Sequence, residues 1–328
     1  MEQLSSTEVA EAQGLLRRVE AVIDQRLVGQ AGLRTCLMAA LMAGGHILIE
    51  SVPGLAKTTA AQALASAISG TFHRIQCTPD LMPSDIIGTQ IYNQTTGQFT
   101  TQLGPVHANV VLLDEVNRSS AKTQAAMLEA MQERQTSIGT KIYPLPSPFL
   151  VLATQNPIEE EGTYVLPEAQ MDRFLLKEVI TYPTPPEEDQ ILSRTLDGSL
   201  AAPIAGNPIA LDDVARLQAL TARVYVAEPL RKYVVAVMNA TRGIGSVRPS
   251  ELVDQVRVGA SPRGAIALVR AAQALALMRG REYVTPDEIK DMRYPVLRHR
   301  LLRTYDAVAA GVTPESLIDA VFAAVPTP

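Results

Sequence analysis

The feature that most constrains the fold is a glycine-containing turn between an apolar run and an alanine-rich stretch. The apolar run His46–Glu50 predicts a buried strand, the turn Ser51–Thr58 reads SVPGLAKT, and the stretch after it predicts an amphipathic helix. A phosphate loop needs backbone N–H groups that point into one concavity, and a helix N-terminus whose partial positive charge faces the anion. The segment is therefore a candidate phosphate loop in an α/β fold.

The match to the phosphate-loop pattern GxxxxGK[ST] is incomplete, because Ser51 and Ala56 replace its two glycines. Lys57 would reach the β- and γ-phosphates of a nucleotide, and Thr58 would offer its hydroxyl to Mg²⁺. The alternative is an ordinary strand–turn–helix junction in which Lys-Thr occurs by chance. The residues expected around the phosphates are Val52, Pro53, Gly54, Leu55, Ala56, Lys57, Thr58 and Thr59.

Helical stretches alternate with short β-rich runs up to about residue 180, which predicts an αβα domain with a mostly parallel sheet. The predicted strands are His46–Glu50, Phe72–Cys77, Val110–Asp114, Phe149–Thr154 and Leu175–Ile180. Two further segments, Ile91–Thr101 and Thr136–Tyr143, carry a glycine between β-prone flanks and predict inserted hairpins.

The proline-rich segment Tyr182–Asp189 predicts a domain boundary, since consecutive prolines cannot continue a strand or a helix interior. Helix starts follow at Ser261-Pro262, Thr285-Pro286 and Thr313-Pro314, each with a capping residue before a proline. We expect residues 1–189 to form the α/β domain and residues 190–328 a small all-helical lid.

An acidic pair, Asp114 and Glu115, and an amide, Asn156, each follow an apolar run. Asp114 at a strand end could hold the Mg²⁺ shell while Glu115 orients or deprotonates a water, although such a pair is also a common loop start. Asn156 follows the run 149–154 and could bind the γ-phosphate or the water, although Asn before Pro is a routine turn former. After a phosphate loop in an alternating chain, the acidic pair indicates hydrolysis of ATP or GTP.

The composition of the chain limits its expected partners and cellular location. The net charge is −5 and aromatic residues make up 4% of the chain, which argues against a general attraction to nucleic acid. The two cysteines, Cys36 and Cys77, have no metal-binding spacing, and the acidic N-terminus lacks a signal-like apolar stretch, so we expect a cytoplasmic protein. The most apolar run, 36–49, is short and interrupted by glycines, so we expect no membrane insertion.

The segments VPGLAKT, LLDEVNR, KTQAAMLEAMQE, ATQNP and LPEAQMDRF together resemble the MoxR family of AAA+ ATPases, and GASPRG, YVTPDEI and VLRHR resemble the lid of that family. The resemblance covers nearly the whole chain from about Val22. It implies ATP and Mg²⁺ as cofactors, a homo-oligomeric ring, commonly a hexamer, with each ATP at a subunit interface, and a match of the two hairpins to inserts of that clade. The family varies at the positions of Ser51 and Ala56.

The resemblance also implies roles for individual residues. Arg173 matches the arginine finger that acts on a neighbouring subunit; without the family, an ion pair with Asp172 or Glu168 is favoured. Arg263 matches a lid arginine that contacts phosphate. Its place in the first turn of a helix disfavours a cation unless an anion is near, and a solvated side chain is the alternative.

Two assignments are less specific. Val28 and Gly29 align with the segment that borders the adenine, where a turn between helices is the plain interpretation. Arg118 could contact a neighbouring subunit, or could cap a helix or form a salt bridge.

Three functions remain open at this point. The first is a protein-remodelling ATPase, for which the resemblance implies a von Willebrand A-domain partner. The second is a nucleic-acid motor, which is disfavoured because Ile91–Pro105 carries no charge and 136–147 only Lys141. The third is an ATP-binding switch with little turnover, which the replaced glycines keep open.

Overall fold

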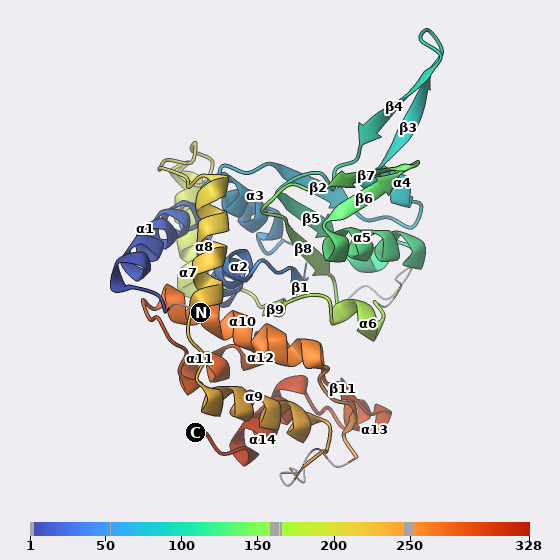
Figure 1. Ribbon diagram of the computed structural model, residues 1–328. Helices are drawn as coiled ribbons and strands as arrows, with labels where there is room; N and C mark the ends of the chain where they lie inside the picture. Colours follow the sequence, from blue (N-terminus) through green and yellow to red (C-terminus); the bar gives the residue numbers. More distant parts are fainter. Residues whose placement is uncertain (1–2, 53, 158–163, 165, 246–251, 253) are drawn as a thin grey trace.

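A five-stranded parallel sheet forms the centre of the computed structural model, which describes residues 3–52, 54–157, 164, 166–245, 252 and 254–328 (Figure 1). The strands, in order across the sheet, are β2 (Phe72–Gln76), β5 (Val110–Asp114), β8 (Leu150–Gln155), β1 (Ile47–Ser51) and β9 (Leu176–Ile180). Each neighbouring pair is parallel. The predicted α/β class is confirmed, and each of the five predicted strands is present within one residue of its expected ends.

Successive side chains of the strands enter two different cores. Ile47 and Ile49 of β1 belong to one buried cluster, and Leu48 between them belongs to another, as the twofold period of a strand requires. Helices cover both faces and complete the αβα layers (Figure 1). The helices on the face of Ile47 are α1 (Ser6–Ile23), α2 (Ala31–Ala43) and α3 (Lys57–Ala67), and those on the face of Leu48 are α4 (Pro83–Ile87) and α5 (Ala121–Glu133).

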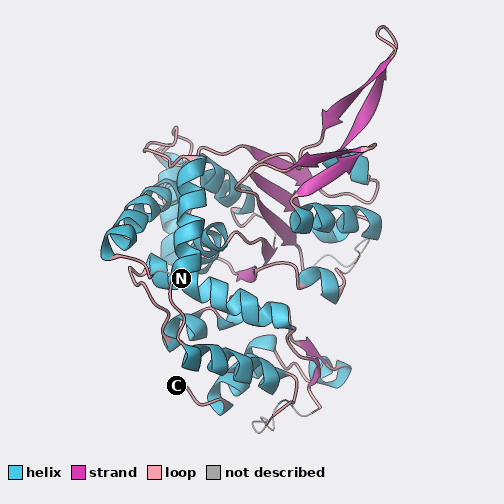
Figure 2. Cartoon of the chain, viewed as in Figure 1, coloured by secondary structure: helices cyan, strands magenta, loops and turns pink. Residues whose placement is uncertain are grey.

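Both predicted hairpins are confirmed. The first pairs β3 (Gly88–Asn93) with β4 (Gln98–Leu103), and the second pairs β6 (Gln135–Ile138) with β7 (Lys141–Pro144). Figure 2 shows the first hairpin projecting far beyond the central sheet. Its base meets the second hairpin through a hydrogen bond between the hydroxyls of Thr101 and Tyr143.

The proline-rich segment ends one element and starts the next. β9 stops at Ile180, and α7 (Pro185–Leu196) begins with both prolines in its first turn and Thr184 as the N-cap of a capping box. The domain boundary expected at residue 189 therefore falls within α7, and it stays a prediction.

The C-terminal part of the chain is mainly helical, as predicted. Ser261, Thr285 and Thr313 are the N-caps of three of its helices, each followed by proline. A two-stranded antiparallel ladder, which the sequence did not predict, joins β10 to β11. The elements after α7 are α8 (Leu211–Arg223), α9 (Glu228–Thr241), β10 (Val256–Val258), α10 (Pro262–Met278), α11 (Pro286–Asp291), α12 (Arg293–Leu297), β11 (Leu302–Arg303), α13 (Tyr305–Ala309) and α14 (Pro314–Ala324).

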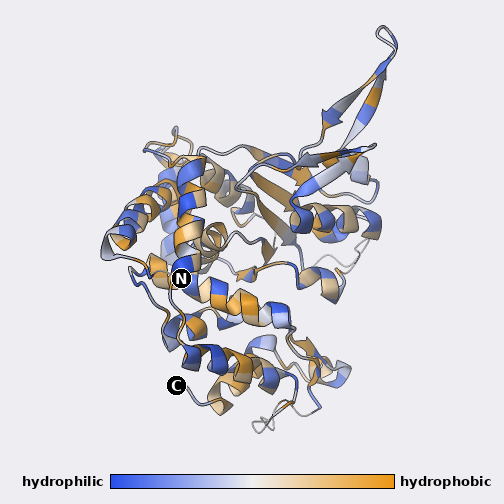
Figure 3. Cartoon of the chain, viewed as in Figure 1, coloured by the Kyte–Doolittle hydropathy of each residue, from blue (hydrophilic) through white to orange (hydrophobic). Residues whose placement is uncertain are grey.

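The C-terminal helices share a core with the sheet. α8 and α10 both pack against α2, and one buried cluster runs from α1 through these helices to α14. In Figure 3 the strands of the central sheet are predominantly hydrophobic, as their burial requires. Among the described helices, none has both the length and the apolar character needed to cross a membrane.

Candidate functional site

The candidate phosphate loop joins the end of β1 to the start of α3. Gly54 has φ +85°, a backbone conformation that favours glycine, and a Cβ there would meet open space, so its need for glycine is conformational rather than steric. Lys57 is the first residue of α3 and directs its Nζ back to the carbonyl oxygen of Val52 at 3.5 Å. Pro53 lies outside the described residues.

The first turn of α3 can accept an anion. Its N-cap is Ala56, which has no side-chain oxygen to bind the first N–H groups of the helix. Thr58 and Thr59 lie in the same turn, and Leu55 packs against the core just before it. Ala56 has φ +51°, which strains a residue with a Cβ by about 1 kcal/mol. A glycine at this position would adopt the same φ without that strain.

Asp114 ends β5 and is held from two sides. Its Oδ1 accepts a hydrogen bond from Thr154 Oγ1 at 2.7 Å, and its Oδ2 accepts from Arg74 Nη2 at 2.6 Å and Nε at 3.1 Å. Thr154 belongs to β8, and Arg74 belongs to β2 on the other side of β5. The two neighbouring strands thus fix a carboxylate that is only 7% exposed.

Glu115 has a left-handed backbone conformation just after the end of β5. Its φ is +58°, a conformation that costs about 1–3 kcal/mol in a residue other than glycine and that clusters at functional sites. Its N–H donates to Thr154 Oγ1 at 2.8 Å. Its Oε2 accepts from Gln76 Nε2 at 3.0 Å and lies 3.4 Å from Arg118 Nε. Arg118 thus forms a salt bridge with Glu115, as one of its interpretations expects. A contact of Arg118 with a neighbouring subunit stays a prediction.

Asn156 follows β8, which lies between β5 and β1 in the sheet. Its side chain is 5% exposed. Parallel strands end at one edge, and neighbours lie about 4.8 Å apart, so the acidic pair and the loop end about 10 Å apart with Asn156 between them. The loop, the acidic pair and the amide that the sequence singles out are brought to one edge, here called the carboxylate edge.

The carboxylate edge suits a magnesium ion. Hydroxyl and carboxylate oxygens are the ligands that Mg²⁺ prefers, and it commonly keeps several waters. Thr58 would supply the hydroxyl, and Asp114 Oδ1 has a lone pair left after its bond to Thr154, so it could accept from a metal-bound water. The donor set therefore fits Mg²⁺ bound to a nucleotide.

Three residues of this edge were missed by sequence reasoning: Arg74, Gln76 and Thr154. Arg74 and Gln76 alternate with buried Ile75 along β2, so the pattern of the predicted strand could have placed both on one face. Thr154 was predicted only as a strand end. Its donation to Asp114 and acceptance from Glu115 depend on which strands are neighbours, and the order of strands is not visible in the sequence.

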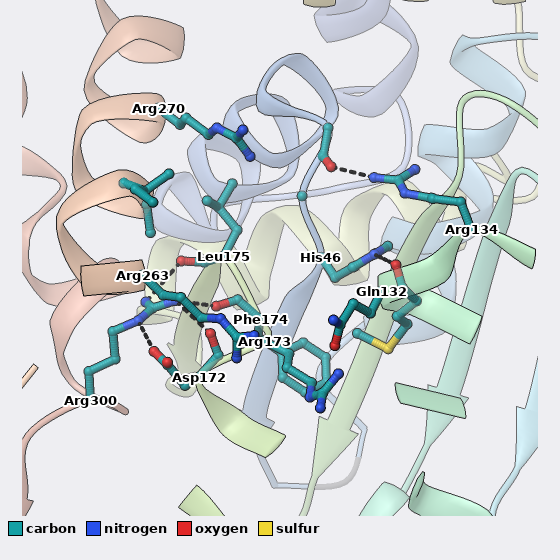
Figure 4. A pocket seen from close by; sticks show the side chains of 15 residues that line it. His46, Gln132, Arg134, Asp172, Arg173, Phe174, Leu175, Arg263, Arg270 and Arg300 are labelled. Carbon is teal, nitrogen blue, oxygen red and sulfur yellow. Dashed lines mark hydrogen bonds and ion pairs between the residues drawn. The ribbon is translucent and has the colours of Figure 1, made fainter. Parts of the chain in front are cut away.

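Arg173 and Arg263 lie at the opposite edge of the sheet. Leu175 N donates to the carbonyl oxygen of His46 at 2.9 Å, just before β9 and β1 begin side by side. A cavity of about 360 Å³ opens here between the sheet and α10 (Figure 4). Its ionisable lining residues are His46, Arg134, Asp172, Arg173, Arg263, Arg270 and Arg300. We call it the arginine edge.

The arginine side chains at this edge fall into two kinds. Arg300 is buried and pairs with Asp172 at 2.8 Å, and Arg257 pairs with Glu168 of α6 (Glu168–Met171) at 2.5 Å. The ion pair of Arg173 with Asp172 or Glu168 is therefore absent. Within the described part of the chain, the exposed guanidinium groups of Arg173 and Arg263 have no hydrogen-bond or ion-pair partner.

Arg270 was also missed. It follows Arg263 by seven residues, two helical turns, so both lie on one face of α10 and both line the cavity. That spacing was visible in the sequence. Its exposed guanidinium likewise has no partner among the described residues.

His46 is a structural residue at this edge. Its Nε2 lies 3.2 Å from the carbonyl oxygen of Met131, and its Nδ1 accepts from Val151 N at 3.0 Å, which fits a neutral ring. Burial, with the nearby charge of Arg134, lowers the pKa of His46 to about 3. The cationic character of the edge therefore comes from arginines alone.

Val28 and Gly29 lie between α1 and α2, as the plain interpretation of a turn between helices expects. Gly29 has φ +65°, and a Cβ there would lie 2.3 Å from the Glu187 carboxylate of α7. The turn is thus packed against the start of α7, and its adenine role stays a prediction.

The chain is similar to known proteins over nearly its whole length. Residues 46–176 match the family described as "ATPase family associated with various cellular activities (AAA)", and residues 253–321 match the family described as "AAA lid domain". A relative named Chaperone MoxR1, from Mycobacterium tuberculosis, is 47% identical over 95% of this chain and 82% of its own. Protein MoxR of Paracoccus denitrificans is 32% identical over 95% of this chain and 96% of its own. A crystal structure from Cytophaga hutchinsonii, 41% identical, covers 98% of this chain and 97% of its own with a TM-score of 0.89.

Proposed function

This chain belongs to the MoxR family of AAA+ ATPases, and on that premise we propose that it hydrolyses ATP at the interfaces of a homo-oligomeric ring to remodel a protein partner. ATPase activity and a chaperone-like role follow from the family. The interface, the ring, the residue roles and the partner are the proposal.

The separation of the two charged edges carries the proposal. A strand of five residues separates the arginine edge from the carboxylate edge, a distance of about 16 Å. Unpaired arginines on one edge and a phosphate loop on the other cannot serve the same nucleotide within one chain. A head-to-tail interface, repeated around a closed ring, would bring the arginines of one subunit to the loop of the next.

At the carboxylate edge, Lys57 would turn from Val52 to the β- and γ-phosphates, and the free N–H groups before Thr59 would bind phosphate oxygens. Mg²⁺, when bound with ATP, neutralises charge on those oxygens. Thr58 would hold the ion with its hydroxyl and Asp114 with Oδ1, directly or through water. Val28 and Gly29 would border the adenine.

Glu115 is the proposed base or orienting group for the attacking water, with Asn156 as a second hydrogen-bonding partner for that water or for the γ-phosphate. Oε2 of Glu115 is bound to Gln76, and Oε1 is the oxygen that would face the water. Arg173 would act from the neighbouring subunit on the charge that develops on the γ-phosphate, and Arg263 would contact the same phosphates.

A polypeptide is the favoured client. The projecting hairpin β3–β4 exposes Tyr92 and Phe99, whose rings pair 5.2 Å apart, and it carries no charge that could neutralise nucleic-acid phosphates. We propose that the partner is a von Willebrand A-domain protein, that the ring is a hexamer, and that the complex works in the cytoplasm.

Mixed rings test the proposal. Equal amounts of Glu115→Gln and Arg173→Ala subunits should recover activity that neither has alone, because an Arg173→Ala subunit then receives a finger from a Glu115→Gln neighbour. Particle mass with and without a Mg-ATP analogue gives the number of subunits. Absence of recovery in rings that are verified as mixed would contradict action between subunits.

A further inference from the structure

One buried arginine is bound to the backbone on both sides of Arg173. Arg300 Nη2 donates to the carbonyl oxygens of Phe174 at 2.6 Å and Asp172 at 3.2 Å, and Nη1 donates to that of Leu175 at 3.2 Å. These carbonyls belong to the residue before Arg173 and to the two residues after it. Planar guanidinium groups suit such multiple contacts because their N–H groups have fixed directions.

The same guanidinium leaves no donor group without a partner. Arg300 Nε donates to Asp172 Oδ1 at 2.8 Å, and Nη1 also donates to the carbonyl oxygen of Val296 in α12. The residue is 6% exposed and so cannot contact a nucleotide at the rim as Arg173 can (Figure 4). Arg300 therefore acts on the backbone of residues 172–175 rather than on a ligand.

Asp172 extends this contact to the lid helix. Its Oδ2 accepts from Ser261 Oγ at 2.8 Å, and Ser261 Oγ in turn accepts from the backbone N–H of Arg263 at 3.1 Å. Asp172, which precedes Arg173 in the chain, is thus bound to the N-cap residue of the helix that carries Arg263. Gly264 lies against the same arginine, with only 3.2 Å between a Cβ built there and Arg300 Cδ.

We propose that Arg300, through Asp172, is a positioning residue that holds Arg173 and Arg263 at the spacing required for binding the phosphates of a neighbouring subunit's ATP. This inference rests on the proposed function of Arg173 in trans. Loss of Arg300 leaves the subunit's own phosphate loop intact and removes its ability to complete the site of its neighbour. A misplacement of about 1 Å at a catalytic group lowers the rate about 100-fold, which is the loss expected in rings made only of Arg300→Met subunits.

Mixed rings separate this role from general damage. With Glu115→Gln subunits, Arg300→Met should recover activity, because about a quarter of interfaces in an equal random mixture pair an intact loop with an intact finger. With Arg173→Ala subunits it should recover none, because both kinds of subunit then lack a working finger. The opposite pattern would place the defect at the phosphate loop of the Arg300→Met subunit and would overturn the inference. Recovery of activity with both partner variants, or with neither, would also overturn it.

A neighbouring arginine provides the matched control. Arg298 also links the lid to the sheet, but it contacts the carbonyl of Lys177 and the carboxylates of Glu178 and Glu315 rather than residues 172–175. Arg298→Met should therefore still restore activity to Arg173→Ala rings. If Arg300→Met subunits do not fold, Arg300→Lys carries the test, since it keeps the charge and loses the planar set of donors.

The reference mixture distinguishes the two failures. If Glu115→Gln and Arg173→Ala subunits do not complement each other, the proposed action in trans fails. If these two variants do complement each other, the action in trans stands. If Arg300→Met or Arg300→Lys then fails to recover activity with Glu115→Gln subunits, or recovers it with Arg173→Ala subunits, only the positioning role fails.

Discussion

The two charged edges of the sheet are organised in opposite ways. At the carboxylate edge the groups of the proposed mechanism are already bound to neighbours: Asp114 to Arg74 and Thr154, and Glu115 to Gln76. At the arginine edge the groups offered to a ligand are exposed and without partners in the described structure, and a buried arginine fixes the backbone that carries one of them.

This difference shows where rearrangement is needed. At the carboxylate edge, the proposed mechanism requires Lys57 to leave the carbonyl oxygen of Val52 when a nucleotide binds, so the final geometry of this edge would depend on the ligand. The arginine edge needs only a phosphate at the right distance, because its backbone is held in advance. Substitutions at each edge should therefore differ in their effects on binding and on turnover.

Replacing Arg173 by alanine should lower kcat about 1000-fold in uniform rings, the lower end of what an arginine finger contributes. ATP binding should change little, since the finger stabilises charge that develops in the transition state. Steady-state phosphate release and nucleotide titration measure the two effects. Arg216→Ala, which removes only an exposed ion pair with Glu11, is the control. A large loss of ATP affinity would contradict the assignment.

Replacing Glu115 by glutamine should lower kcat about 100-fold while Mg-ATP remains bound. The amide keeps the shape of the side chain and removes its capacity to take a proton. Single-turnover hydrolysis checks the rate, and calorimetry checks the binding. Glu129→Gln, exposed on α5, is the matched control. Unchanged turnover would remove Glu115 from the mechanism.

Mild acid should destabilise the chain through the arginine edge. Burial, followed by the charge of Arg300, lowers the pKa of His299 well below 6.5, and the pKa of His46 is about 3. Below pH 6.5 the unfolded chain binds protons that the folded chain excludes, so the free energy of unfolding falls by about 1.4 kcal/mol per pH unit for each histidine.

Urea unfolding should therefore show a loss of about 2 kcal/mol between pH 6.5 and 5.5, because each unfolded histidine is only half protonated at the start of this range. His299→Gln should roughly halve this dependence, whereas His73→Gln, on the exposed side of β2, serves as the control. A pH-independent midpoint over this range would contradict the prediction.

Replacing Arg270 by alanine should raise the KM for ATP about fivefold with little change in kcat, because a single charge-assisted hydrogen bond contributes about 1 kcal/mol. The reason is its place on the same face of α10 as Arg263. Steady-state kinetics in uniform rings test it, with Arg231→Ala on α9 as the control. An unchanged KM would restrict the edge to Arg173 and Arg263.

Replacing Ala56 by glycine should have the smallest effect. It relieves the positive φ at the N-cap of α3 and should stabilise the chain by about 0.5–1 kcal/mol. Thermal unfolding without nucleotide measures it. Ala63→Gly, in the interior of the same helix, should instead destabilise by about 1 kcal/mol. A lower Tm for Ala56→Gly would show that the strain is absent.

Local patterns were sufficient for most of the fold. The five central strands, both hairpins and the three proline-marked helix starts each follow from apolar runs, glycine turns or capping residues. The ladder of β10 and β11 was missed because it joins two segments that are about 45 residues apart and too short for an alternating pattern to be distinctive.

The sequence likewise predicted the candidate site residues but not the contacts between them. The candidate groups could be found because each follows a strand or begins a helix, but the partners of Asp114 and Glu115 lie on strands whose order the sequence does not reveal. The separation of Arg173 from the phosphate loop likewise depends on strand direction. The contact of Arg300 with residues 172–175 spans more than 120 residues of chain, beyond any local pattern.

The continuous apolar cluster from α1 to α14 has a thermodynamic consequence. Because α8 and α10 both bury side chains against α2, removing the C-terminal helices would expose the outer surface of the αβα layers to water. Neither part can melt while the other keeps its packing. Heating should therefore produce a single cooperative heat-absorption peak rather than two.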